Sequence, residues 1–179
     1  MPEEKRETRA EEVARVRSYL ASQAIKRTPA QLVEALREAH RQFLAAAATV
    51  PDELFRVPPG NEEWSAADVM GHMLIIAAID ASAIPGVIER GEQPPDVVDL
   101  VSPAPTDLTR EQMLAELERL RERLIASVLQ ADPAAHLDIL WGHNEFGQMN
   151  WREWLLFARV HTLDHARQMQ AIATALAQS

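Results

Sequence analysis

The stretch of sequence that decides the fold spans residues 150–168 and reads NWREWLLFARVHTLDHARQ. Its apolar positions recur every three or four residues, which is the period of an amphipathic helix. His161 and His165 fall on the apolar side, one turn apart and pointing the same way. Two imidazoles placed like this can bind one metal ion, so the pattern raises the question of a third ligand. The apolar side consists of Trp154, Ala158, His161, His165, Met169 and Ile172.

The composition is that of an ordinary globular protein. The chain has 179 residues, with 47% hydrophobic and 25% charged residues, which is enough for one domain with a real core. Its net charge of -9 disfavours nucleic acid and anionic membrane as partners. There is no cysteine, so histidine, aspartate and glutamate are left as the strong metal ligands.

We expect a soluble protein of the cytoplasm. The first residues, MPEEKRE, lack the apolar segment of a secretory signal. The longest apolar stretch, Val69 to Ile79, is shorter than the roughly 20 residues that cross a bilayer. The absence of cysteine is compatible with a reducing compartment.

Capping signals divide the chain into helices. A residue that caps a helix, followed by an apolar period, stands at Thr28, Ser65, Thr109 and Asn150. These signals predict long helices over about 28–50, 65–91 with a kink at Pro85, 109–130, and from 150 onward. Two loops, 91–107 with four prolines and 133–149, should be irregular, and we find no convincing strand pattern.

The predicted fold is all-α, a four-helix bundle formed by residues 28–179 with an extra helix in an N-terminal extension, residues 1–27. Residues 3–26 look helical and carry mixed charges. We expect this helix to pack on the main body or on a second subunit, because charges this mixed usually mark a solvated face. A docking arm for an acidic partner is the alternative.

A third histidine, His72, lies on the apolar side of the predicted helix that Ser65 begins. Three imidazoles on facing helices are explained more simply by one common ligand than by three separate burials, although core histidines remain an alternative. Three neutral ligands leave a coordination position open, as in catalytic zinc sites. Zn²⁺, Ni²⁺ and Fe²⁺ all accept imidazole, so the residues do not choose the metal.

Further residues are candidates for supporting roles. Asp68, Asp164 and Gln168 lie about one turn from a histidine, where each could accept a hydrogen bond from a ligand ring. Capping or surface roles are the alternative for the two carboxylates, and an exposed position for Gln168. The loop residues Trp141, His143 and Phe146 either form the mouth of a pocket or close the end of the core. For His143, the alternatives are a proton shuttle, a contact to the last helix, or a solvated side chain, and for His40 we expect a structural role.

The sequence contains WSAADVMGH at 64–72, HNEFGQMNWREW at 143–154 and HTLDHARQ at 161–168. Together these three segments resemble the DinB/YfiT-like superfamily. This resemblance implies an up-down-down-up four-helix bundle, often dimeric, with a divalent metal held by His72, His161 and His165. Asn144, Asn150 and Asp164 depart from the family pattern, standing where a proline, a threonine and, in many members, an additional histidine are usual.

The resemblance implies a metal-dependent enzyme acting on a small-molecule substrate. Characterised relatives include hydrolases and S-transferases that use a low-molecular-weight thiol. Because this chain has no cysteine, thiol chemistry would need an external thiol activated by the metal. The alternative is a non-catalytic, stress-related protein that binds a metal or a small ligand, or a dimerisation scaffold. No motif fixes a general base beside the histidines, which leaves that alternative open.

Overall fold

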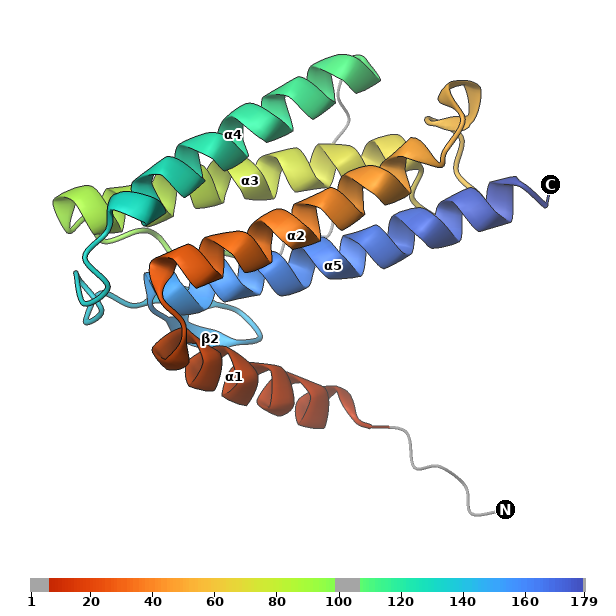
Figure 1. The fold of residues 1–179 in the computed structure, drawn as a ribbon. Helices are drawn as coiled ribbons and strands as arrows, with labels where there is room; N and C mark the ends of the chain where they lie inside the picture. The colour runs from red at the N-terminus through yellow and green to blue at the C-terminus, as the bar shows by residue number, and fades with distance from the viewer. Residues whose placement is uncertain (1–6, 99–106, 179) are drawn as a thin grey trace.

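The computed structural model describes residues 7–98 and 107–178, and within them the chain is mostly helical (Figure 1). The all-α prediction is confirmed. Helix α1 precedes four longer helices, and a small two-stranded sheet lies just before the last of them. The elements are α1 (Arg9–Lys26), α2 (Pro29–Ala48), a 3₁₀ turn (Asp52–Leu54), α3 (Ala66–Arg90), α4 (Arg110–Gln130), β1 (Trp141–His143), β2 (Gly147–Met149) and α5 (Trp151–Leu176).

Each α-helix begins with a complete capping box. The capping side chain accepts a hydrogen bond from a backbone N–H in the first turn, and the side chain three residues later accepts one from the backbone of the cap. These pairs satisfy donors that every helix start leaves open. Helix α3 continues unbroken through Pro85 and ends at Gly91, whose φ of 63° suits glycine. The capping residues are Thr8, Thr28, Ser65, Thr109 and Asn150.

The four long helices form an up-down-down-up bundle. Helices α2 and α5 run in one direction and α3 and α4 in the other (Figure 1). Contacts join α2 to α5, α5 to α3, α3 to α4 and α4 to α2, so the core lies inside a ring of four helices. Because α3 and α4 are parallel, the end of α3 and the start of α4 lie at opposite ends of the bundle (Figure 1).

The predicted absence of strands is wrong. Strands β1 and β2 pair antiparallel, with Trp141 opposite Met149 and His143 opposite Gly147. Val97, from the segment after α3, adds a parallel bridge to His143, with a backbone hydrogen bond of 2.7 Å to Gly142. Each strand has three residues, which is too short for an alternating pattern to be recognised in the sequence.

The apolar stretch Val69–Ile79 lies within the longer helix α3. By length and composition alone, α3 could cross a membrane, since its most apolar 18-residue window has a mean hydropathy of 1.6. However, 56% of that window is buried, and α3 packs against both α4 and α5. The same composition is expected of the central helix of a bundle.

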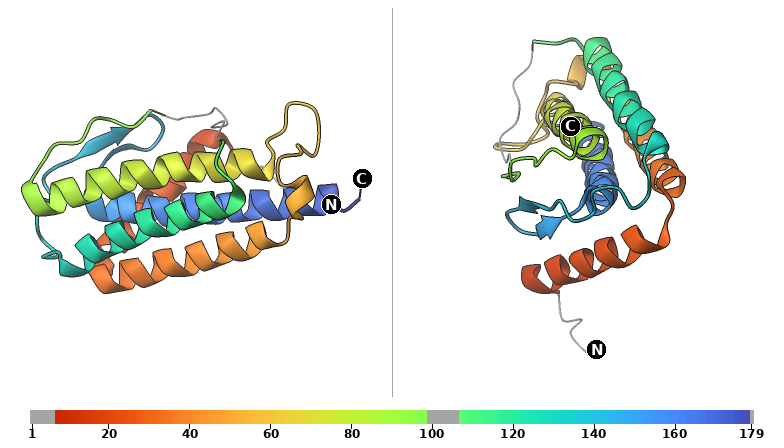
Figure 2. Two further views of the ribbon diagram at one scale, coloured as in Figure 1. Left: turned by 90° about the horizontal axis from the view of Figure 1, so that it is seen from above. Right: turned by 90° about the vertical axis from the view of Figure 1, so that its left-hand side faces the viewer.

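Helix α1 lies outside the bundle, beside the sheet and the first half of α5 (Figure 2). Arg17 connects it to both. Its Nη1 lies 2.7 Å from Glu153 Oε1 on α5, and its Nη2 donates to the Gln148 carbonyl of β2 at 2.6 Å. The part of the N-terminal helix predicted for residues 3–6 lies outside the described residues.

Candidate metal centre

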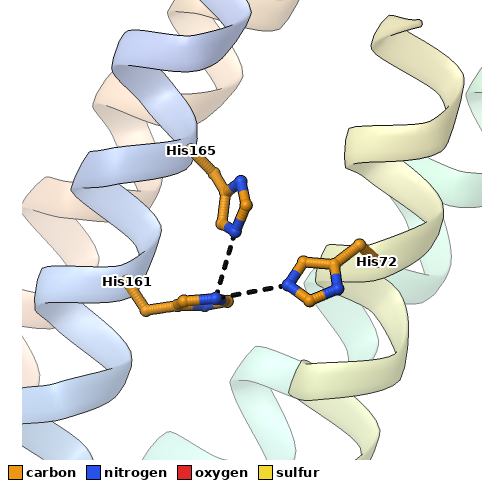
Figure 3. A group of neighbouring side chains, drawn as sticks. All are labelled: His72, His161 and His165. Atoms are coloured by element: carbon orange, nitrogen blue, oxygen red, sulfur yellow. Dashed lines mark hydrogen bonds between the residues drawn. The ribbon is translucent and has the colours of Figure 1, made fainter. Parts of the chain in front are cut away.

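Three histidine side chains converge between two neighbouring helices (Figure 3). His72 comes from α3, and His161 and His165 come from successive turns of α5. The Nε2 atom of His161 lies 3.2 Å from that of His72 and 3.0 Å from that of His165. One nitrogen from each ring lies within 4.8 Å of the others, so the three histidines form a possible metal site.

The separations between these nitrogens suit one shared ion. Two imidazole nitrogens bound to a tetrahedral zinc at about 2.05 Å stand roughly 3.3 Å apart. The separations from His161 to the other two rings are 3.2 and 3.0 Å. Both of these contacts involve His161, so His161 lies at the centre of the cluster.

The protonation states also fit a metal. Burial, reinforced by His165 and His72, lowers the pKa of His161 to about 2, and burial also lowers the pKa of His165. Both rings are therefore neutral near pH 7. The Nδ1 of His165 lies 2.8 Å from Gln168 Oε1, an acceptor, so Nδ1 carries the proton and Nε2 keeps its lone pair.

A pocket of about 190 Å³ opens beside the cluster, and His72 and His161 form part of its wall. Trp64 contacts the His72 ring edge-on at a centroid distance of 5.4 Å, and the Phe157 ring lies 5.9 Å from that of His161. Most of the wall is aromatic or aliphatic, as is common in sites for small molecules. The lining residues are Trp64, His72, Ile76, Ile79, Asp80, Val97, Val98, His143, Trp154, Phe157 and His161.

Of the three residues expected to support a histidine ligand, one contacts a histidine and two do not. Gln168 contacts His165 as described above. Asp68 instead completes the capping box of α3, with its Oδ2 accepting hydrogen bonds from the backbone N–H and the hydroxyl of Ser65. Asp164 is exposed and pairs with Arg167 at 2.7 Å rather than with a histidine. The two carboxylates thus take the capping and surface roles that the sequence left open.

The loop residues His143 and Trp141 have different roles. His143 lines the pocket, and the centroid of its ring lies 4.9 Å from those of both Phe146 and Phe157. Trp141 is 1% exposed and stacks on Trp154, so it closes the core and is not part of the pocket wall.

His40 lies elsewhere, between α2 and α4. Its Nε2 is 3.1 Å from Glu118 Oε2. This agrees with the structural role expected for it.

Sequence reasoning missed a buried polar group near the cluster. Asp80 on α3 lines the pocket, and Arg121 on α4 is fully buried in the same part of the core. The Nη2 of Arg121 donates to Thr162 Oγ1 at 3.0 Å. Asp80 follows the apolar positions of α3 at helical spacing, and that spacing was the only available signal.

Comparisons with known proteins agree with this geometry. The family model for the DinB superfamily matches residues 35–169, which include all three histidines. A solved structure, described as a crystal structure of TT2238, a four-helix bundle protein, superimposes with a TM-score of 0.62. It is 22% identical, and the match covers 80% of this chain and 99% of that one, which shows a shared fold. Comparison with curated proteins gives no match.

Proposed function

The chain belongs to the DinB superfamily, and on that premise we propose that it is a metal-dependent enzyme acting on a small molecule. His72, His161 and His165 would hold a divalent ion, either zinc, nickel or iron. The observation that carries the proposal is the convergence of three Nε2 atoms beside a pocket whose wall includes His72 and His161. A cluster that served only to fill the core would need no adjoining space for a ligand.

The ion would supply an open position that activates a water, for hydrolysis, or a low-molecular-weight thiol, for S-transfer. Residues of the chain would orient the ligands and form the pocket around them. Gln168 orients the His165 ring, and Trp64 and Phe157 pack against His72 and His161. The apolar wall removes water from around the reacting groups, which strengthens electrostatic interactions there.

Turnover assays test the proposal. The purified protein, loaded with each metal in turn, should hydrolyse an ester or amide, or conjugate an electrophile with an added thiol. A requirement for the thiol would identify the S-transferase. His165→Ala should lower the rate at least about 100-fold, because loss of one ligand weakens metal binding.

Two outcomes contradict the proposal. Unchanged turnover in His165→Ala would exclude the histidine cluster as the active site. A bound metal with no turnover in any assay would favour a non-catalytic binding protein. A homodimer and a cytoplasmic location belong to the same proposal, with size measurement in solution as the test of the first.

A further inference from the structure

We infer that Asp80 is the proton acceptor for the nucleophile at the histidine cluster, a role that rests on the proposed function. Deprotonation of water or of a thiol needs a base, and no motif in the sequence supplies one. The structure places an aspartate on the wall of the same pocket as His72 and His161.

The position of Asp80 in the helix explains this placement. Eight residues, roughly two turns of α-helix, separate it from His72 on α3, so the two side chains share one face. Asp80 is 5% exposed, and its Oδ2 is buried with no hydrogen-bond partner within the described part of the chain. Burying a carboxylate without a partner is costly, and a ligand that donates to it recovers that cost.

The charges around Asp80 suit a group that takes up a proton and later gives it back. Arg121, from α4, is the cation that acts on it, while His72, His143 and His161 share its pocket. Burial raises the pKa of Asp80 to about 6, against the opposing effect of Arg121. Just above pH 6 the carboxylate is therefore ionised and is more basic than an ordinary aspartate, as a general base near neutral pH should be.

The proton balance of the step is simple. A thiol R–S–H, or a water, gives its proton to the Asp80 carboxylate, which becomes the neutral acid. The electron pair of the broken S–H or O–H bond stays on the sulfur or oxygen, which then attacks the substrate. The neutral Asp80 returns the proton to the leaving group or to solvent, so Asp80 ends the cycle as it began.

The rate at which a bound thiol loses its proton tests this role without any turnover. Nickel-loaded protein is mixed with 2-mercaptoethanol at pH 7.5, and stopped-flow absorbance follows the thiolate-to-metal band. A thiol that coordinates a metal is deprotonated. Wild type and Asp80→Asn should reach the same final absorbance, but Asp80→Asn should reach it about 100-fold more slowly, because a positioned base contributes about that factor to a proton transfer.

Two variants serve as controls. Asp138→Asn removes the same charge from an exposed carboxylate and should behave as wild type. Asp80→Glu keeps a base in the pocket and should retain most of the wild-type rate. Nickel content and thermal unfolding confirm that each variant is folded and loaded.

The results separate the two proposals. Equal rates of thiolate formation in wild type and Asp80→Asn, with thiol bound to both, overturn the role of Asp80 and leave the metal site intact. A nickel-loaded protein that binds no thiol contradicts the open coordination position, and with it the role of Asp80.

Discussion

At the scale of single residues, Gln168 determines which nitrogen of His165 faces the cluster. Its Oε1 accepts from Nδ1 at 2.8 Å, and this leaves the Nε2 lone pair directed at His161. Partners of this kind also hold the ring in one orientation. The side chain lies at the edge of the cluster on α5, one turn after the histidine that it contacts.

Replacing Gln168 with alanine should therefore weaken zinc binding about 10- to 100-fold, the usual effect of losing such a partner. The matched control is Gln170→Ala, two positions along the same helix and exposed. Competition with a coloured chelator measures both affinities. Equal affinities in the two variants would show that Gln168 has no part in ligand orientation.

Asp80 also makes the stability of the metal-free protein depend on pH. Its pKa is about 6 in the folded state and 3.8 in the unfolded chain, so the folded state binds its proton more tightly. The stabilisation from Asp80 is complete below pH 3.8 and is lost as the pH rises through 6. The shift corresponds to about 3 kcal/mol.

The measurable quantity is the difference between wild type and Asp80→Asn in the free energy of unfolding. Relative to the variant, wild type should lose about 3 kcal/mol between pH 3 and pH 8. The titrations of His161 and His165 are present in both proteins and largely cancel. Urea unfolding in the presence of a chelator gives the values, and a difference that does not change with pH would contradict the raised pKa.

At the scale of elements, α1 supports the sheet that brings His143 to the pocket. The Arg17 guanidinium joins Glu153, whose side chain is 8% exposed, to the backbone of β2. Glu153 also completes the capping box of α5 by accepting from the backbone of Asn150. One arginine thus links the start of the helix that carries His161 and His165 to the strand paired with His143.

Arg17→Ala should destabilise the protein by about 2 kcal/mol, since charged hydrogen bonds to a buried carboxylate and a carbonyl are lost. Backbone amides of the sheet should also exchange hydrogen faster. Arg15→Ala is the control, because Arg15 pairs with an exposed Glu7 and such pairs contribute below about 1 kcal/mol. Similar losses in both variants would mean that α1 does not hold the sheet in place.

At the scale of the whole molecule, the bundle was predictable because its signals are local. A capping box needs two residues three apart, and an apolar stripe needs one helix, so the helix starts at Thr28, Ser65, Thr109 and Asn150 were visible in the sequence. The histidines lie on such stripes, which is why their convergence could be anticipated. Sequence resemblance added the order of the helices.

What the sequence did not reveal depends on contacts between distant segments. Asp80 and Arg121 are both ordinary surface residue types, and only the packing of α3 against α4 buries them. The sheet depends on a glycine with φ of 70° at Gly147 and on pairing with Val97, more than forty residues earlier. Asp164 fell at the right spacing from His161, but it lies on the exposed side of α5.

Metal content is the measurement that tests the central claim most directly. Purified protein, loaded with zinc and dialysed, should hold about one ion per chain, and His72→Ala and His165→Ala should each hold less than about a tenth of that. His136→Asn, which changes an exposed histidine outside the cluster, should keep full occupancy. Full occupancy in both His72→Ala and His165→Ala would contradict a metal site formed by the three histidines.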